Sequence, residues 1–395
     1  MKIVILGGGI SGLSAAFHFY KIKPHAKIVL LEASSRLGGC IQSKSVGPFL
    51  FELGPPTFEK NRSPFLLKLI EEVGLKDEII ESDPSAKKRF IWHQNKLRSI
   101  PSFWPILLAA VAKDLVSKKK LNEDESIHDF AVRRFGKKIA EIFFNPMAKG
   151  VFGGDSRKLS LQSCFPILHE WEQRHRSIIQ AMFKEKRKSG SLFTLKNGMG
   201  RLVDALSLLP IEICTNCPVD KLENEGVWAN QQFWQADLIV SALPPKVISR
   251  ISGIDLDIRM EPLSVVNFGF TKALNMKKGY GYLTTGDHEL LGQIWDSQVF
   301  PIDNQTKLTS MVRGENPEKV ALAALKDHLK IDVVPDCIHT TFASIPQYDL
   351  FHRMRIDRFQ NEFFQKFPNV QLIGNYFDGA SVESCIRPFS KEVYS

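Results

Sequence analysis

Apolar runs at the start of the chain predict a strand, a helix and a second strand. Residues 3–6 form a continuous apolar run, residues 10–22 are rich in helix-forming residues, and residues 26–31 form a second apolar run. Residues 236–242 and 370–374 resemble buried strands that end in loops of small residues, as in a parallel sheet. The pattern therefore predicts a β-α-β nucleotide-binding domain assembled from separate parts of the chain.

Between residues 100 and 190 the pattern becomes helical. Apolar residues recur at helical spacing in residues 124–134, 137–145 and 165–188. We expect a helical insert here, with a helix over each of these three stretches.

One part of this insert is a candidate membrane contact. Residues 103–112 are apolar but too few to cross about 30 Å of hydrocarbon as a helix, which takes about 20 residues. With Trp104 and the lysines at 118–120, the segment fits an interfacial helix that meets anionic headgroups. A buried helix or a homodimer contact is the alternative interpretation.

Residues 251–350 follow a different pattern. β-Branched and aromatic residues alternate in stretches such as 265–270 and 308–312, which fits a sheet with one covered face. We interpret this region as a substrate domain.

Composition and charge narrow the class of protein. The chain has 395 residues, 44% of them hydrophobic and 24% charged, which is typical of a folded soluble protein. The 52 basic residues exceed the 43 acidic ones and favour an anionic partner, but they are too dispersed for a nucleic-acid site. Scattered cysteines and a start without a secretory leader predict a cytoplasmic protein. Cys214 and Cys217 are a lone pair, so no metal site is expected.

A dinucleotide fingerprint follows the first predicted strand. Gly7 to Gly12 fits G-x-G-x-x-G, in which the glycines permit a tight turn, a close approach to a pyrophosphate and close helix packing. Glu32 lies at the end of the second strand, about 20 residues further on, where a carboxylate binds the ribose hydroxyls. The chain lacks the G-x-S-x-G, HExxH and Walker signatures of other enzyme classes.

The next residues resemble known flavoproteins. Glu32 to Gly39 reads EASSRLGG, similar to the E-x(3)-R-x-G-G extension of FAD-binding proteins. Residues 51–58 resemble the loop that passes the isoalloxazine ring in flavin amine oxidases. Residues 149–166 and 172–177 resemble the oxygen-dependent protoporphyrinogen IX oxidases, and this likeness covers nearly the whole chain.

The resemblance implies an α/β chain, α+β overall, in three parts. These are a Rossmann-like FAD-binding domain of the p-hydroxybenzoate hydroxylase type, a mixed-sheet substrate domain and a helical membrane-binding insert. The corresponding ranges are 1–80 with 195–250 and 365–395, then 81–100 with 251–364, and finally 101–194.

The resemblance also implies which residues contact FAD. They are Gly7, Gly8, Gly9, Ile10, Ser11, Gly12, Glu32, Arg36, Gly38, Gly39, Cys40, Gly54, Pro55, Pro56, Thr57, Val219, Asn375, Ala380, Ser381 and Val382. Val219 would meet the adenine through its backbone, and residues 380–382 would face the flavin pyrimidine end, which is negative when reduced.

By the same resemblance, the substrate is a tetrapyrrole with propionates. Three hydride transfers from its methylene bridges to FAD give the aromatic ring, and O₂ reoxidises the flavin to yield H₂O₂. Arg89 matches a propionate anchor, Tyr280 and Leu283 match residues that sandwich a pyrrole ring, Met311 matches a pocket wall, and the Gly150 backbone matches a group facing the reacting bridge. A peripheral location on the cytoplasmic membrane is implied.

Two departures and three alternatives accompany this interpretation. Pro56 stands where many relatives have an arginine, and Pro388 is expected to shorten the C-terminal helix and to affect flavin affinity. Oxidation of coproporphyrinogen III, which carries four propionates, is the nearest alternative. A non-catalytic flavin- or porphyrin-binding protein is another, and amine oxidation is disfavoured because no aromatic cage is recognisable.

Overall fold

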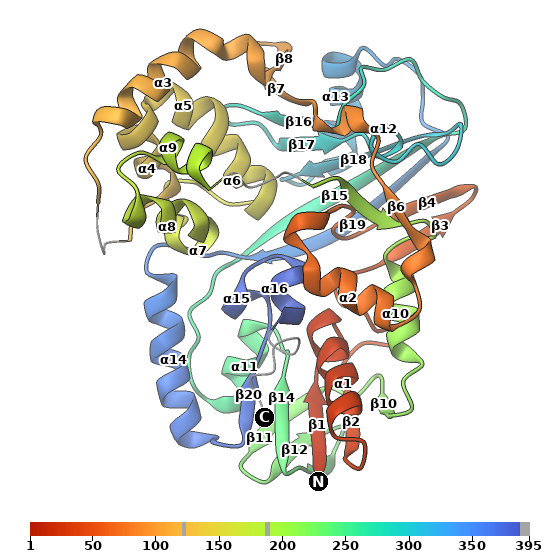
Figure 1. The fold of residues 1–395 in the computed structure, drawn as a ribbon. Helices are drawn as coiled ribbons and strands as arrows, with labels where there is room; N and C mark the ends of the chain where they lie inside the picture. Colours follow the sequence, from red (N-terminus) through yellow and green to blue (C-terminus); the bar gives the residue numbers. More distant parts are fainter. Residues whose placement is uncertain (121–123, 186–189, 388–395) are drawn as a thin grey trace.

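The computed structural model describes residues 1–120, 124–185 and 190–387. A parallel five-stranded sheet of order β10-β2-β1-β14-β20 lies at one end of the molecule (Figure 1). Its strands are β1 (Lys2–Leu6), β2 (Lys27–Leu31), β10 (Glu212–Cys214), β14 (Leu238–Ser241) and β20 (Val370–Leu372). The expected β-α-β start is confirmed, with α1 (Ile10–Ile22) between β1 and β2.

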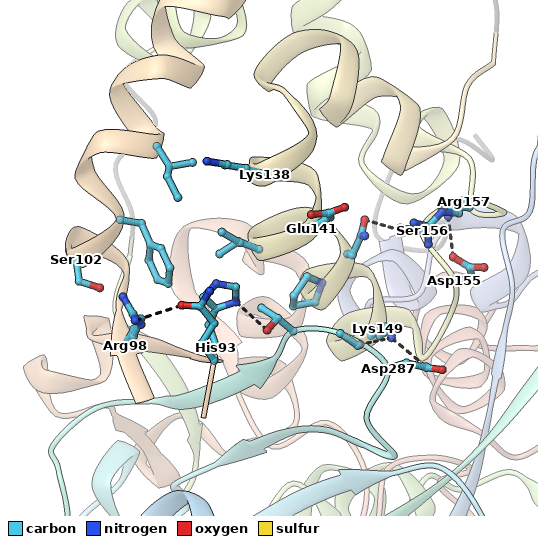
Figure 2. Close-up of a pocket in the computed structure, with 18 of the residues that line it drawn as sticks. His93, Arg98, Ser102, Lys138, Glu141, Lys149, Asp155, Ser156, Arg157 and Asp287 are labelled. Carbon is cyan, nitrogen blue, oxygen red and sulfur yellow. Dashed lines mark hydrogen bonds and ion pairs between the residues drawn. The ribbon is translucent and has the colours of Figure 1, made fainter. Parts of the chain in front are cut away.

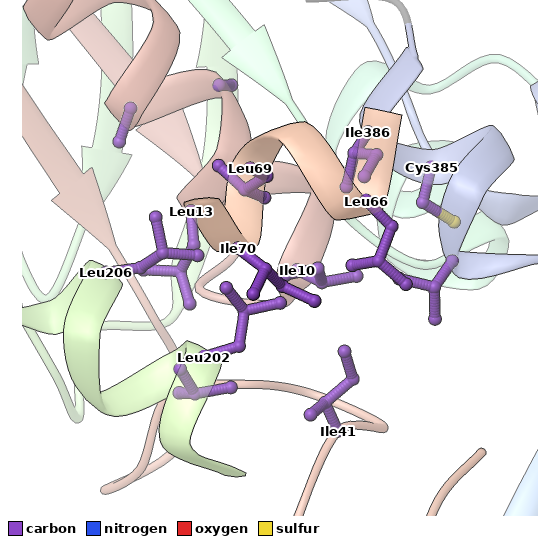
Figure 3. Close-up of a cluster of buried hydrophobic side chains, with 14 of the residues drawn as sticks. Ile10, Leu13, Ile41, Leu66, Leu69, Ile70, Leu202, Leu206, Cys385 and Ile386 are labelled. Carbon is purple, nitrogen blue, oxygen red and sulfur yellow. The ribbon is translucent and has the colours of Figure 1, made fainter. Parts of the chain in front are cut away.

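Both faces of this sheet are covered. Alternate residues of β1 point to opposite faces and pack in two different hydrophobic clusters. Ile3 and Ile5 pack with α1, α2 (Pro64–Glu72), α10 (Gly200–Ser207) and α16 (Val382–Ile386). Figure 3 shows the centre of this cluster, where Leu13 of α1, Leu66 and Ile70 of α2, and Leu206 of α10 meet.

The opposite face of the sheet packs on a second group of elements. Val4 and Leu6 contact the antiparallel strands β11 (Val219–Glu223), β12 (Gly226–Ala229) and β13 (Gln232–Gln235) and the helices α11 (Pro245–Ser252) and α14 (His352–Lys366).

A mixed seven-stranded sheet forms the second layer. Its order is β19-β15-β18-β17-β16-β7-β8, antiparallel except where β16 runs parallel to β7. The strands are β7 (Arg89–His93), β8 (Lys96–Ser99), β15 (Met260–Phe270), β16 (Gly281–Thr284), β17 (Leu290–Ile294), β18 (Thr306–Val312) and β19 (Cys337–Pro346). Helix α13 (Pro317–Leu329) covers one face. The expectation of a sheet with a single covered face is wrong for β15, where residues 265–270 are all buried because both faces of the strand are covered.

The helical insert gathers at one corner of the molecule (Figure 1). Its elements are α3 (Trp104–Val116), α4 (Ile127–Phe135), α5 (Lys137–Ile139), the π-helix η5 (Ala140–Phe144), α6 (Asn145–Phe152), α7 (Leu161–Cys164), α8 (Pro166–Arg174) and α9 (Ile178–Lys184). The prediction of one helix over residues 165–188 is wrong, because the helix is interrupted at residues 175–177. Residues 186–188 lie outside the described part. No helix in the described ranges is long and apolar enough to span a membrane.

Shorter elements connect these layers. They are β3 (Ser43–Val46), β4 (Phe49–Glu52), β5 (Phe58–Glu59), η1 (Lys60–Arg62), η2 (Lys76–Glu78), β6 (Ile79–Glu81), η3 (Pro84–Lys87), η4 (Ile100–Phe103), β9 (Leu192–Leu195), α12 (Asp296–Val299) and α15 (Asn375–Asp378). The hairpin β3–β4 leads directly into the loop at residues 54–57.

Candidate functional site

The turn between β1 and α1 is tightly packed at Gly12 and has free space at Gly9. Gly7 has a φ of +97°, and a Cβ at Gly12 would lie 1.9 Å from the Gly7 carbonyl oxygen, so α1 packs directly on the turn. A Cβ at Gly9 would meet only the Gly39 Cα, at 3.9 Å. The open side at Gly9 leaves room for a ligand.

Unpaired donors face this open side. Gly9 is the N-cap of α1, no side chain caps the helix, and no acidic residue lies in its first turn. The free N–H groups and the positive end of the helix dipole favour an anion. Ile10 and Ser11 are buried and hold the first turn in place. This cradle fits the pyrophosphate of a dinucleotide.

Glu32 links three loops beside the cradle. Its carboxylate accepts hydrogen bonds from Gly8 N (2.6 Å), Ser34 N (2.8 Å) and Ser34 Oγ (2.7 Å). Because a carboxylate has about four acceptor sites, capacity for a ligand hydroxyl remains. The Glu32 carbonyl accepts from Cys217 N (2.8 Å), which brings the buried Val219 at the start of β11 close to this site.

Arg36 stabilises the next loop from within. Its guanidinium donates to the carbonyl oxygens of Leu37 (3.1 Å) and Gly39 (2.8 Å). Gly38 (φ +99°) and Gly39 (φ +57°) both adopt backbone conformations that favour glycine. The Arg36 side chain therefore stabilises this loop by binding its backbone carbonyl groups. The loop also contacts the fingerprint, because Gly38 N donates to the Gly8 carbonyl oxygen (2.8 Å).

Cys40 connects this loop to the one at residues 54–57. A Cβ at Gly54 would lie 1.9 Å from the Cys40 carbonyl oxygen, so the two backbones touch. Desolvation by the surrounding protein raises the pKa of the Cys40 thiol, although the side chain keeps accessible surface and Arg36 opposes the shift. Pro55 and Pro56 then restrict the backbone on the way to Thr57.

The C-terminal site residues lie at two helix starts. Asn375 is the first residue of α15, and Ser381 caps α16 by accepting a hydrogen bond from a backbone N–H of its first turn. Glu383 accepts from two backbone N–H groups at the start of α2, at 2.9 and 3.1 Å, so residues 380–382 are held against the parallel-sheet domain. The expected break at Pro388 lies outside the described residues.

Three of the expected substrate residues converge on one face of the mixed sheet. Leu283 pairs with Gly292, which pairs with Met311, so these residues form one row across β16, β17 and β18. Helix α6 packs on this face, where a Cβ at Gly150 would lie 2.3 Å from Leu283 Cδ2. Gly150 is therefore the point of closest approach between α6 and the sheet.

Arg89 and Tyr280 lie at the end of the sheet nearest the 54–57 loop. The Arg89 guanidinium carbon is 4.9 Å from the centre of the Tyr280 ring. Tyr280 Oη lies 3.0 Å from Thr57 Oγ1, and burial raises the pKa of this tyrosine. The structure therefore joins the expected flavin loop to the expected substrate residues through Tyr280.

Sequence reasoning missed Asp296, which lies beside this contact. It follows Trp295, whose backbone N–H donates to the Tyr280 carbonyl (2.9 Å), and its Oδ2 accepts from Thr309 Oγ1 (2.8 Å). Burial raises the pKa of Asp296 to about 7. A single carboxylate within the apolar stretch 290–300 was the signal available in the sequence.

A cationic pocket opens beside α6 (Figure 2). It has a volume of about 990 Å³ and lies between α3, α6 and the β16–β17 turn. Its charged lining residues are Arg98, Lys138, Lys149, Arg157, Arg313, Glu141, Asp155 and Asp287. Lys149 Nζ donates to the Gly286 carbonyl (2.7 Å) and lies 3.7 Å from the Asp287 carboxylate. The described lining does not include the expected substrate residues.

Comparison with known proteins gives matches over almost the whole chain. A protoporphyrinogen oxidase from Bos taurus is 30% identical, with 98% of this chain and 96% of the relative covered. A coproporphyrinogen III oxidase from Bacillus subtilis is 26% identical, with 97% and 95% covered.

Solved structures share the fold. A provisionally named protoporphyrinogen oxidase from Exiguobacterium sp. superimposes with a TM-score of 0.86 at 20% identity, covering 98% of this chain and 96% of that one. A UDP-galactopyranose mutase gives a TM-score of 0.75 at 15% identity, with 98% and 93% covered.

The family comparison agrees with the geometry of the cradle. Residues 10–387 match the family described as flavin containing amine oxidoreductase. The glycine turn, the free helix N-terminus and the Glu32 loop fit the FAD that this family implies, so the protein is an FAD-dependent oxidoreductase. The chain belongs to the flavin-containing amine oxidoreductase family.

Proposed function

We propose that this protein oxidises protoporphyrinogen IX to protoporphyrin IX, in three two-electron steps with O₂ as the final acceptor and H₂O₂ as the second product. The observation that carries the proposal is the contact between the 54–57 loop and the mixed sheet through Tyr280, with Arg89 above the tyrosine ring. The full-length similarity to protoporphyrinogen oxidases supports the same reaction.

The proposed FAD contacts follow the path of the glycine turn and its neighbouring loops. The N–H groups at the start of α1 would bind the pyrophosphate, Glu32 would accept from the ribose, and Val219 would meet the adenine. Residues 54–57, Asn375 and residues 380–382 would surround the isoalloxazine. When bound, FAD supplies the two-electron oxidation that protein side chains lack.

The proposed substrate contacts are made by residues of the sheet and of α6. Arg89 would hold a propionate with a fixed pair of donors, which offsets the desolvation of the carboxylate. Tyr280 and Leu283 would contact a pyrrole ring, Met311 would form the wall, and the Gly150 backbone would face the bridge. Residues 81–100 and 251–364 would then act as the substrate domain, and the parallel sheet as the FAD domain.

We also propose that α3 lies on the cytoplasmic membrane surface. Trp104 is 64% exposed and Leu108 61% exposed on its outer side, and Phe183 of the contacting helix α9 is 76% exposed. Exposed apolar side chains next to the lysines at 118–120 suit an interface with anionic headgroups. A second copy of the chain covering the same stripe is the alternative, and size measurement in detergent-free buffer distinguishes the two.

Anaerobic mixing tests the main proposal. The FAD-loaded protein is mixed with protoporphyrinogen IX, and loss of the oxidised-flavin absorbance is followed. Rapid bleaching, followed by porphyrin formation when O₂ is admitted, supports the proposal. An unbleached flavin with either porphyrinogen would indicate a non-catalytic binding protein.

Coproporphyrinogen III is the second candidate substrate. The cationic pocket beside α6 favours it, because four propionates need more positive partners than two. The relatives from Bacillus subtilis and Staphylococcus aureus named coproporphyrinogen III oxidases support it as well. Faster flavin bleaching by coproporphyrinogen than by protoporphyrinogen would select this alternative.

A further inference from the structure

Asp296 lies where the flavin loop and the substrate sheet meet. Strand β17 ends at Ile294, whose register partners are Gly281 on β16 and Thr309 on β18. Asp296 follows two residues later, begins α12 and accepts a hydrogen bond from Thr309 Oγ1 at 2.8 Å. The backbone of its neighbour Trp295 is hydrogen-bonded to Tyr280. The carboxylate is therefore anchored to the end of the sheet that carries the proposed ring contacts.

Asp296 keeps some accessible surface although protein surrounds it. It is half-buried, while the preceding Trp295 and the following Ser297 are buried. Tyr280, Glu52 and Met311 on neighbouring elements are likewise half-buried. Partly accessible side chains that converge inside the molecule are expected where a ligand cavity adjoins them.

The charged groups that act on Asp296 come from several elements. Lys307 of β18 favours its ionised form, but the Lys307 ammonium already pairs with Asp303 at 3.3 Å. Glu52 at the end of β4 opposes ionisation by like-charge repulsion, and burial raises the pKa of Glu52 itself.

The other elements near α12 add little charge. Tyr280, which precedes β16, is a neutral neighbour whose pKa is raised by burial. The 3₁₀ turn η3 packs on α12 through Ala86, and its Lys87 is exposed. Among the described residues, the Asp296 carboxylate thus has one side-chain hydrogen-bond donor, Thr309, and it keeps acceptor capacity for a ligand.

We propose that the Asp296 carboxylate faces the bound tetrapyrrole and accepts the proton that a ring nitrogen releases after each oxidation of a methylene bridge. This inference rests on the proposed function. In each step the bridge C–H bond breaks and its electron pair leaves as hydride to the bound flavin, so the substrate becomes a cation. An N–H bond then breaks, its electrons form a C=N bond, and the proton forms an O–H bond on Asp296. Over the three oxidations the ring loses three hydrides from three bridges and three protons. On balance two of these protons come from N–H groups and the third comes from the fourth bridge, whose C–H proton moves to a ring nitrogen by tautomerisation.

The geometry and the acidity of Asp296 suit this role. A carboxylate beside a developing cation stabilises it electrostatically, and the stabilisation is larger in a site that excludes water. A pKa of about 7 means that the group can both accept and release a proton near neutral pH, which a cycle of three oxidations requires.

The test compares the FAD-loaded wild-type protein with Asp296→Asn and Asp257→Asn. Asp257 is an exposed carboxylate in the segment before β15 and does not line the cationic pocket, so its variant is a matched control for loss of one charge. The wild-type kcat should rise with pH through about 7 as Asp296 ionises. Asp296→Asn should lower kcat by about 100-fold or more, the usual scale for loss of a general base, and should abolish this pH dependence. Asp257→Asn should behave as wild type.

A second variant and a spectroscopic measurement separate chemistry from folding. Thr309→Val removes the hydrogen bond to Oδ2, so the kinetic pKa should move to higher pH while Asp296 remains. Infrared difference spectra of the substrate-free holoenzyme should contain a neutral carboxyl band that titrates near pH 7 and is missing in Asp296→Asn.

The outcomes are distinguishable. If the wild-type protein oxidises neither porphyrinogen, both the proposed function and this inference fail. If it is active and Asp296→Asn keeps its rate and pH profile, or if the Thr309→Val profile does not move, only the role of Asp296 is overturned.

Discussion

Glu32 binds protein backbone and is positioned to bind a ligand at the same time. Replacing it by Ala should weaken FAD binding by about 1–3 kcal/mol, because hydrogen bonds to a charged partner are lost and Gly8 N loses its acceptor. Fluorescence titration of FAD measures the change. Glu32→Gln, which keeps one acceptor oxygen, should lose less affinity than Glu32→Ala, and equal affinity in all three proteins would contradict the ribose assignment.

The proposed role of Arg89 depends on the planar shape of its guanidinium group, which can form two parallel hydrogen bonds to a carboxylate. Arg89→Ala should lower kcat/KM by about 10- to 150-fold, which corresponds to about 1.5–3 kcal/mol for a lost charged hydrogen-bond partner. Arg89→Lys should recover only part of this loss, since an ammonium group cannot form a bidentate pair.

The neighbouring exposed cation Lys88 provides the control for Arg89. Lys88→Ala should leave kcat/KM and the flavin spectrum nearly unchanged. Equal effects of the two substitutions would show that only overall positive charge matters at this edge of the sheet.

Individual residues were predictable where the reason is local. Gly7 has a positive φ and Gly12 packs on the Gly7 carbonyl, and both constraints lie within a six-residue turn, so a sequence motif reveals them. Asp296 was not predictable, because its partners Thr309 and Glu52 come from other strands. Arg36 is expected to contact FAD, and in the structure its guanidinium also donates to two carbonyl oxygens of its own loop, which the motif did not reveal.

At the scale of elements, the single helix predicted over residues 165–188 is two helices in the described part of the chain, α8 and α9. The break between α8 and α9 is fixed by distant residues, since Arg134 Nη1 donates to the Arg176 carbonyl (2.9 Å) and Asp114 accepts from Ser177 Oγ (2.5 Å). Ser177 also caps α9 by accepting from Gln180 N (3.1 Å). The S-x-x-Q spacing of a capping box was the local signal that marks this start.

The helices of the insert are joined by a buried ion-pair network. Arg134 of α4 is fully buried and donates to Glu172 of α8 at 2.6 and 2.9 Å. Burial opposes ionisation of Glu172, but bonds from Arg133 and Arg134 lower its pKa. Arg134→Met should destabilise the protein by about 3–5 kcal/mol, because the buried Asp114 loses its ion pair with Arg134 and Glu172 keeps only Arg133.

Urea unfolding followed by fluorescence measures this effect. Lys137→Met on the adjacent helix α5 is the control, because the ion pair of that exposed lysine with Glu141 is long, at 3.8 Å. It should change stability by less than about 1 kcal/mol. A similarly small effect of Arg134→Met would mean that the insert does not depend on this network.

Helix α3 has an apolar outer stripe. Substitutions on this helix should distinguish residues that bind a membrane from residues that stabilise the fold. Replacing Trp104 and Leu108 by Ser should move the protein off anionic vesicles while FAD stays bound. Leu107 was expected to share this surface, but it is half-buried against Phe103 and Ile142, so Leu107→Ser should instead lower stability.

Vesicle cosedimentation measures the binding of these variants. Leu208→Ser at the end of α10, outside the helical insert, removes a leucine that is more exposed than Leu108, at 82% against 61%, and should not alter sedimentation. Loss of binding by this control, or retained binding by the double variant, would remove α3 from the membrane surface.

At the scale of the whole molecule, the two sheets and the helical insert were predictable from the sequence, but the strand pairings that connect distant parts of the chain were not. The parallel sheet was foreseeable because each strand is a short apolar run followed by small residues. The parallel pairing of β7 with β16 links opposite halves of the chain, and local patterning carries no information on it. That pairing places Arg89 beside Gly281 and so determines where Arg89 meets Tyr280.

The FAD site joins segments from the beginning, the middle and the end of the chain, so ligand binding should stabilise the entire fold. A ligand that binds only the folded state stabilises it by about 2.7 kcal/mol at a concentration of 100 times its Kd. Thermal unfolding of the FAD-stripped protein should therefore shift upward by several degrees when FAD is added. Riboflavin lacks the adenine and the pyrophosphate and cannot use the α1 cradle or Glu32, so it should produce little shift. Equal shifts with both ligands would mean that the cradle contributes no binding energy and that the isoalloxazine contacts alone hold the cofactor.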